Sequence, residues 1–147
     1  MRTIRITRIA ACGAALAALL PPICRADIEG TQAADISGQE ICVVDNSYTG
    51  ADFRDAYVRQ IRARGFAARI VQEKTECPIS TTFVATYART AWGRYLRNSM
   101  LTVLRNGEEI AVVRYHGSRG KPFKGTVESV IGEMVAVLYP QASAQSR

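Results

Sequence analysis

Hydrophobic and polar positions follow two different periods along the chain, and these periods predict where helices and strands lie. The run ICVVD at 41–45 is short, apolar and β-branched, as buried strands are, and FAARIV at 66–71 is a second such run. Between them, residues 51–64 carry an apolar side chain at every third or fourth position, which predicts an amphipathic helix. A strand, a helix and a strand joined by short links form a right-handed crossover, so the two strands are predicted to be parallel.

The second half of the chain alternates with a period of two, which is typical of strands with two different faces. Residues 81–90 and 95–104 are two such runs, and we place a break between them near Gly93. The pair Asn106-Gly107 accepts positive φ readily and predicts a tight hairpin into a third run at 109–116. Three further strands are therefore expected, the last two of them joined as a hairpin.

A last apolar stripe predicts a helix over 126–138, so a second helix follows the predicted strands. We expect an α/β chain of the α+β two-layer sandwich type, a mixed sheet of about five strands with both helices on one face and the other face partly open. The globular domain is predicted to span 41–140. Residues 27–40 show no period and are predicted to be a flexible arm, and 141–147 a disordered tail.

The first 26 residues have the pattern of a secretory signal peptide, with arginines first, then an apolar run too short to span a bilayer, then two prolines. Small side chains at Cys24 and Ala26 favour cleavage after Ala26 and a periplasmic protein. The alternative is lipidation of Cys24, which would tether the protein to the inner or outer membrane. Pro22 and Ile23 fit a lipoprotein signal poorly.

Removal of the signal peptide takes away four arginines and lowers the net charge from +6 to +2, so nothing in the charge favours a nucleic-acid partner. It also leaves two cysteines, Cys42 and Cys77, in an oxidising compartment, which favours a disulfide. The predicted topology argues against that bond, because it puts the two residues at opposite ends of the sheet unless 73–77 folds back. The spacing fits neither a metal site nor a redox motif, and we predict no metal and no cofactor.

Two sequence features are candidates for chemistry. His116 is the one histidine, and as a general base it needs a nucleophile and an orienting acid that no motif supplies, so a solvent-exposed histidine at a strand end is favoured. The loop before the last helix carries Arg119, Lys121 and Lys124, and Thr126 opens the helix, which makes a possible anion-binding loop. The simpler interpretation of that loop is a solvated basic segment.

Aromatic and basic residues alternate around Gly93. They form a candidate partner surface for a glycan, a lipid headgroup or an envelope protein, made of Tyr87, Trp92, Arg94, Tyr95 and Arg97. The competing interpretation is that the rings fill the core while the arginines extend to its edge.

Several stretches together resemble the small proteobacterial envelope proteins known as Sbal-type lipoproteins. The motifs are ICVVDN, ECPISTTFVATYART, RNGEE and the final VLYP. The resemblance implies an envelope location, a disulfide between Cys42 and Cys77, and aromatic positions at Phe83 and Tyr87; it implies no activity. The chain departs from many members at Cys24, where its lipidation motif is poor.

These observations favour an exported periplasmic protein that is not an enzyme and that serves as a binding or assembly module for another envelope component. The alternative is a small hydrolase of cell-wall or lipid substrates with His116 as its base. A membrane tether is expected only if Cys24 is lipidated.

Overall fold

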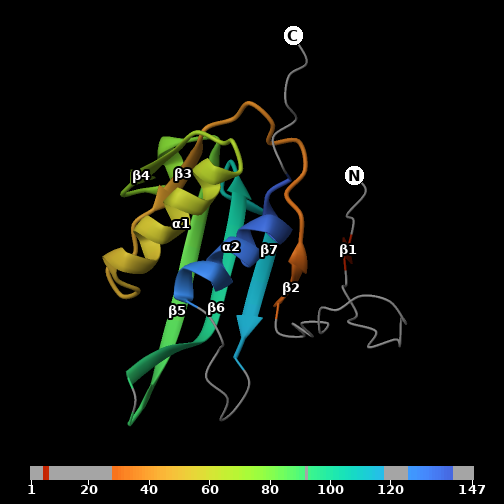
Figure 1. Ribbon diagram of the computed structural model, residues 1–147. Helices are drawn as coiled ribbons and strands as arrows, with labels where there is room; N and C mark the ends of the chain where they lie inside the picture. The colour runs from red at the N-terminus through yellow and green to blue at the C-terminus, as the bar shows by residue number, and fades with distance from the viewer. Residues whose placement is uncertain (1–4, 7–27, 92, 118–125, 141–147) are drawn as a thin grey trace, which may run out of the picture.

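A mixed β-sheet and two helices packed on one of its faces form the fold (Figure 1). The computed structural model describes residues 5–6, 28–91, 93–117 and 126–140. Helix α1 spans Ala51–Ala63 and helix α2 spans Val127–Leu138, and the two lie side by side on the same face. The predicted α+β sandwich with both helices on one face is confirmed. Neither described helix has the length and apolar composition needed to cross a membrane.

The strand order in the sheet is β1-β2-β7-β6-β5-β3-β4. The strands are β1 Arg5–Ile6, β2 Ile28–Thr31, β3 Ile41–Val44, β4 Ala68–Val71, β5 Ile79–Thr90, β6 Gly93–Arg105 and β7 Glu108–His116. Strand β3 is parallel to both β4 and β5, and every other pairing is antiparallel. The predicted parallel crossover and the predicted hairpin are therefore both present.

The segment 28–40 is part of the fold, so the prediction of a flexible arm there is wrong. Strand β2 pairs with β7, with Ile28 opposite Tyr115. Ala33 and Ile36 are fully buried, and the amide of Ala33 donates to the carbonyl of Leu138 at 2.8 Å. Three widely spaced apolar side chains anchor this segment, and such irregular spacing has no period that a pattern search detects. At the outer edge, β2 also pairs with β1, whose two residues belong to the predicted signal peptide.

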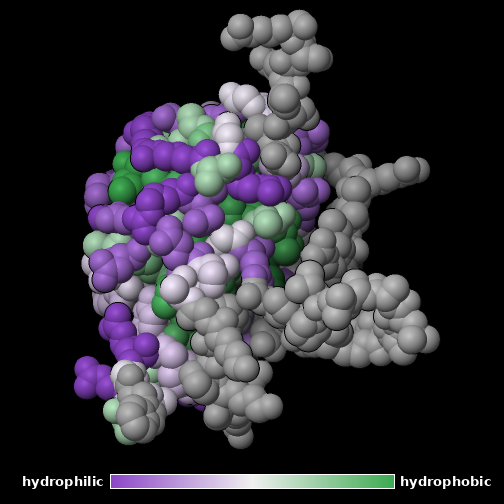
Figure 2. Space-filling view, in the orientation of Figure 1, coloured by the Kyte–Doolittle hydropathy of each residue, from purple (hydrophilic) through white to green (hydrophobic). Residues whose placement is uncertain are grey.

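The core lies between the sheet and the two helices. Tyr57 of α1 is fully buried, and its hydroxyl is 2.7 Å from Oγ1 of Thr81 and 2.8 Å from the hydroxyl of Tyr139. Thr81 in turn donates to the carbonyl of Thr102 at 2.8 Å, so the hydroxyl groups of these three side chains all have hydrogen-bond partners. Burial raises the pKa of Tyr139 to about 12. On the outer side of the helices, Figure 2 shows mostly hydrophilic side chains, as the amphipathic pattern requires.

The chain returns from β4 to β5 across the face opposite the helices. This return includes the short 3-10 helix η1, Lys74–Glu76, and it brings Cys77 over Cys42. The two residues form a disulfide with their Cα atoms 6.1 Å apart. The fold-back that the bond requires is thus present. Elsewhere on this face Val84 is 46% exposed, which agrees with the expected partly open face.

Strands β5 and β6 continue beyond all their neighbours. Pairing of β3 with β5 ends at Thr81, and pairing of β6 with β7 ends where Asn98 lies opposite His116. Residues 87–91 and 93–97 therefore form a two-stranded projection, which we call the ribbon. In Figure 1 it extends at the bottom past the ends of both helices, at the opposite end of the sheet from the β6–β7 turn.

Candidate functional site

The ribbon carries three exposed arginines within nine residues. Arg89 of β5 and Arg94 of β6 are directly opposite each other in the antiparallel register, so their side chains leave the same face of the ribbon. Arg97 lies nearer the sheet, next to an irregularity in the pairing of the two strands. Like charges directly opposite each other on a two-stranded ribbon destabilise it, so this arrangement has an energetic cost.

The three ribbon arginines differ from most other arginines of the protein. Within residues 28–91 and 93–117, six arginines donate to a carboxylate or a carbonyl: Arg54, Arg59, Arg62, Arg64, Arg69 and Arg105. In the same ranges, Arg89, Arg94, Arg97 and Arg114 have no oxygen acceptor. Three of these four lie on the ribbon. In these ranges every arginine outside the ribbon except Arg114 is thus engaged within the fold, and the guanidinium groups of the ribbon are available to a partner.

The ribbon carries two tyrosine rings, one on each of its faces. The guanidinium carbon of Arg94 lies 4.3 Å from the ring centroid of Tyr87, within the range of a cation–π contact. Burial raises the pKa of Tyr87, and the charge of Arg94 opposes that rise. Tyr95 is half-buried on the other face of the ribbon. Of the predicted partner surface, Tyr87, Arg94, Tyr95 and Arg97 are thus brought together.

The residues on either side of the turn of the ribbon have a defined geometry. The hydroxyl of Thr90 donates to the carbonyl of Gly93 at 3.0 Å, and Gly93 has a φ of 128°, which glycine adopts more readily than other residues. Trp92 lies between them and falls outside the described residues. Its predicted place in the partner surface stays a prediction.

The predicted anion-binding loop is also mostly outside the described residues, since it includes Arg119, Lys121 and Lys124; Cys24 lies outside them as well. Thr126 is described, and its side chain caps α2 by accepting from the amide of Ser129 at 3.1 Å. The loop and the fate of Cys24 stay predictions.

His116 has an amide side chain as its partner. Its Nδ1 lies 3.2 Å from Oδ1 of Asn98, its cross-strand neighbour, and the histidine is exposed. Within the described ranges no carboxylate, serine or cysteine side chain forms a hydrogen bond with it. Among the described residues, His116 therefore has neither a hydrogen-bonded nucleophile nor an orienting acid beside it.

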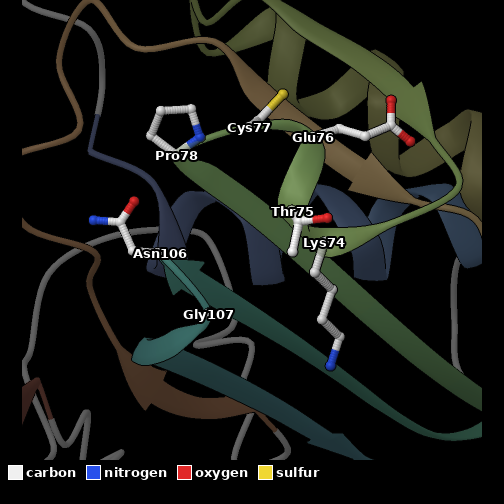
Figure 3. Close-up of a pocket in the computed structure, with 7 residues that line it drawn as sticks. All are labelled: Lys74, Thr75, Glu76, Cys77, Pro78, Asn106 and Gly107. Atoms are coloured by element: carbon white, nitrogen blue, oxygen red, sulfur yellow. The ribbon is translucent and has the colours of Figure 1, made fainter.

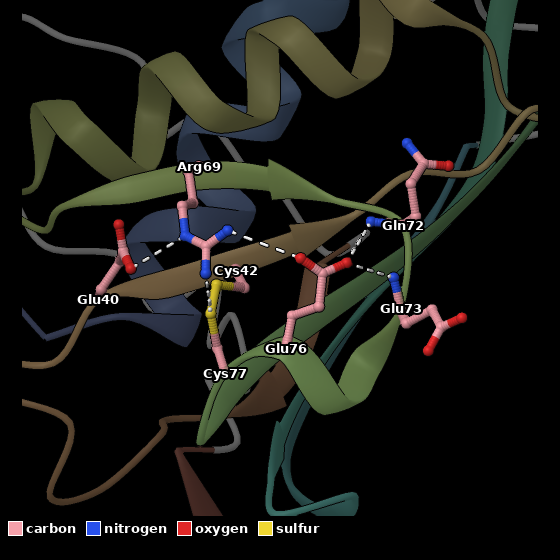
Figure 4. Close-up of a disulfide and its surroundings, with 7 residues drawn as sticks. All are labelled: Glu40, Cys42, Arg69, Gln72, Glu73, Glu76 and Cys77. Atoms are coloured by element: carbon pink, nitrogen blue, oxygen red, sulfur yellow. Dashed lines mark hydrogen bonds and ion pairs between the residues drawn. A yellow bond between two sulfur atoms is a disulfide. The ribbon is translucent and has the colours of Figure 1, made fainter.

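The disulfide lies beside a small ionic network (Figure 4). Arg69 donates from Nη2 to Sγ of Cys77 at 3.2 Å and from Nε to Glu40 at 3.1 Å, and its Nη1 is 3.7 Å from Glu76. The two sulfur atoms and Glu40 are close enough together to ligate a metal ion. However, both sulfurs are in the disulfide and the cation of Arg69 lies among them, so this cluster is structural.

A shallow pocket of about 330 Å³ lies between η1 and the β6–β7 turn, at the end of the sheet away from the ribbon (Figure 3). Its charged lining residues are Lys74 and Glu76. Glu76 is already engaged, because it accepts from the amides of Gln72 and Glu73 at 3.0 and 3.1 Å. The pocket thus offers little chemistry, and the ribbon is the stronger candidate site.

Comparisons with known proteins reveal a likeness of fold. Neither a protein-family model nor a curated protein matches the chain. The solved PelC dodecamer from Paraburkholderia phytofirmans superposes with a TM-score of 0.56 at 15% sequence identity, over 76% of this chain and 97% of that chain. A structure of a PelC variant from the same organism, also a dodecamer, gives a TM-score of 0.57 at 16% identity, over 78% and 97%. At this identity the chain shares the fold of PelC.

Proposed function

We propose that this chain is an exported module of the cell envelope that works by binding, with the ribbon as its contact surface. The observation that carries the proposal is the ribbon itself, a projection on which three arginines have no oxygen acceptor among the described residues. Guanidinium groups without an oxygen acceptor on a projecting element can donate to a partner without breaking an internal hydrogen bond or ion pair. Binding, and not catalysis, is the role that such a surface supports.

Two further observations support the envelope location. The N-terminal sequence has the pattern of a secretory signal peptide, and the Cys42–Cys77 disulfide suits an oxidising compartment. The resemblance to Sbal-type lipoproteins points the same way. We propose the periplasm as the site of action, with a membrane tether if Cys24 is lipidated.

The test is capture from envelope extract of the native host. The bait is the mature protein with a C-terminal tag, compared with the double variant Arg89→Ala/Arg94→Ala. Arg59→Ala is the matched control, because Arg59 is also exposed but pairs with Glu128 on the helical face. We expect the double variant to lose the captured components and the control to retain them. Equal capture by all three baits would contradict a role for the ribbon.

A second proposal concerns assembly, and the dodecameric state of PelC supports it. We propose that copies of this chain associate with one another, and we expect mass photometry of the mature protein to show species heavier than the monomer. A monomer at every concentration tested would refute it.

A further inference from the structure

The two arginines nearest the tip of the ribbon are register partners, so their side chains start close enough together to reach one ligand. Residues directly opposite each other in an antiparallel pair have Cβ atoms about 5 Å apart. Arg89 and Arg94 are such a pair, both are exposed, and both extend from the same face. A single anion between them would neutralise the repulsion that the pair otherwise causes.

From this geometry we propose that Arg89 and Arg94 form a phosphate-binding pair, which deepens the proposed function and rests on it. The argument for phosphate is the number of oxygens. One planar guanidinium engages both oxygens of a carboxylate through two parallel hydrogen bonds. A phosphate group has further oxygens and accepts from two guanidinium groups at once.

The residue types fit this role. Within the described part of the ribbon every basic residue is arginine, and arginine presents the rigid fork of donors that phosphate recognition uses, where lysine presents a point charge. The contact of Arg94 with the ring of Tyr87 fixes the position of its guanidinium before a ligand arrives. Pre-positioning lowers the entropy that binding must overcome.

The position of the ribbon suggests where the phosphate comes from. Strand β2 starts at Ile28, which lies opposite Tyr115, and the next residue of β7, His116, lies opposite Asn98 at the base of the ribbon. The described domain therefore begins at the same end of the sheet as the ribbon. If Cys24 is lipidated, the tether precedes Ile28 in the chain, and a lipid headgroup is one source of phosphate near this end. The other source is a phosphate group on a soluble molecule.

The experiment uses the mature protein, residues 27–147, at an ionic strength of about 0.15 M, which screens distant charges. One arm measures co-sedimentation with vesicles of phosphatidylglycerol and phosphatidylcholine. The other arm measures binding of inorganic pyrophosphate by calorimetry, with tricarballylate as a carboxylate of similar charge. The variants are Arg89→Ala/Arg94→Ala and Arg89→Lys/Arg94→Lys, and the control is Arg114→Ala, an exposed arginine of β7 without an oxygen acceptor among the described residues.

We expect the alanine pair to weaken binding in at least one arm by about tenfold or more, the lysine pair to weaken it by less, and the control to bind as the wild type does. Binding to vesicles alone identifies a lipid source, and saturable binding of pyrophosphate identifies a soluble one. No binding in either arm, an equal loss in Arg114→Ala, or equal affinity for tricarballylate would overturn the inference. All three arginines are exposed, so we expect the variants to unfold at the same temperature as the wild type. That measurement excludes misfolding as the cause of weaker binding.

The failure of this inference is distinguishable from failure of the proposed function. If the alanine pair abolishes capture from envelope extract but neither arm detects phosphate binding, the ribbon is a contact surface for another kind of partner. If the alanine pair changes neither capture nor phosphate binding, both proposals fail.

Discussion

Removing the Cys42–Cys77 bond is expected to lower the free energy of unfolding by about 4 kcal/mol. The bond closes a loop between residues separated by 35 positions, and the chain-entropy relation for a loop of that length gives about 4 kcal/mol at 25 °C. The origin is the unfolded chain, which gains conformational freedom when the loop opens. The folded state changes little, because Arg69 keeps its contacts with Glu40 and Glu76.

The assay is urea unfolding followed by circular dichroism, on the oxidised protein, the reduced protein and the variant Cys42→Ala/Cys77→Ala. With an m-value of about 2 kcal/mol/M, the midpoint should fall by about 2 M on reduction. The reduced protein is the control that separates the loop from packing, since it keeps both sulfur atoms in place. The alanine variant should lose slightly more, because it also removes buried atoms beside Val71.

The reasoning would be refuted if reduction changed the free energy of unfolding by less than about 1 kcal/mol, well below the range expected for a native loop of this size. That outcome would mean that the unfolded chain already keeps residues 42 and 77 close together, so that the bond removes little of its conformational freedom.

Three other predictions follow from the structure. Burial raises the pKa of Tyr139 to about 12 while the unfolded residue titrates near 10, so the unfolded state loses its proton first. Tyr139 alone should therefore lower the free energy of unfolding by up to about 3 kcal/mol between pH 10 and pH 12, and the buried Tyr57, whose pKa is raised as well, should add to this fall. The fall should be shallower in Tyr139→Phe. Urea titrations across that range check it, and a stability that stays constant to pH 11.5 would contradict it. Gly30→Ala should destabilise strongly, since the new Cβ would lie 2.5 Å from a backbone oxygen of β7, whereas Gly132→Ala in α2 meets only a side-chain end at 3.1 Å and should be neutral or stabilising by about 0.5–1 kcal/mol. Thermal unfolding of the two variants compares them directly, and equal shifts would show the contact at β2 to be unimportant. Intact mass of protein from an envelope fraction should match residues 27–147 and rise by about two mass units on reduction; an acylated chain beginning at Cys24 would show lipidation instead.

The periodic parts of the fold were predictable from the sequence. Strands β3 and β4 and helix α1 follow patterns that depend only on which side chains face the core, and the hairpin follows from the positive φ that Asn106 and Gly107 accept. Segment 28–40 was missed because its buried side chains are few and irregularly spaced. The disulfide was left open because it depends on the direction of 72–78, a short segment with no period.

The candidate site was predicted in part. The aromatic and basic residues around Gly93 stand out in the sequence, but the sequence alone left open whether they belong to the core or to a partner surface. That choice depends on how far β5 and β6 extend beyond β3 and β7, which is a property of strand pairing and not of any one strand. Arg89 also lies among the basic residues around Gly93 but is not part of the predicted partner surface, and its importance appears only with its register partner Arg94.

The continuity of β5 and β6 has a mechanical consequence. Both strands run without a break from the ribbon into the centre of the sheet, where they pair with β3 and β7. A pull on the tip along the strand direction would load those hydrogen bonds in shear, all at once, and not one after another as in unzipping. A partner attached there would therefore hold the whole domain through its most extensively paired strands, and resistance to force would be set by the rate of unfolding of the domain itself.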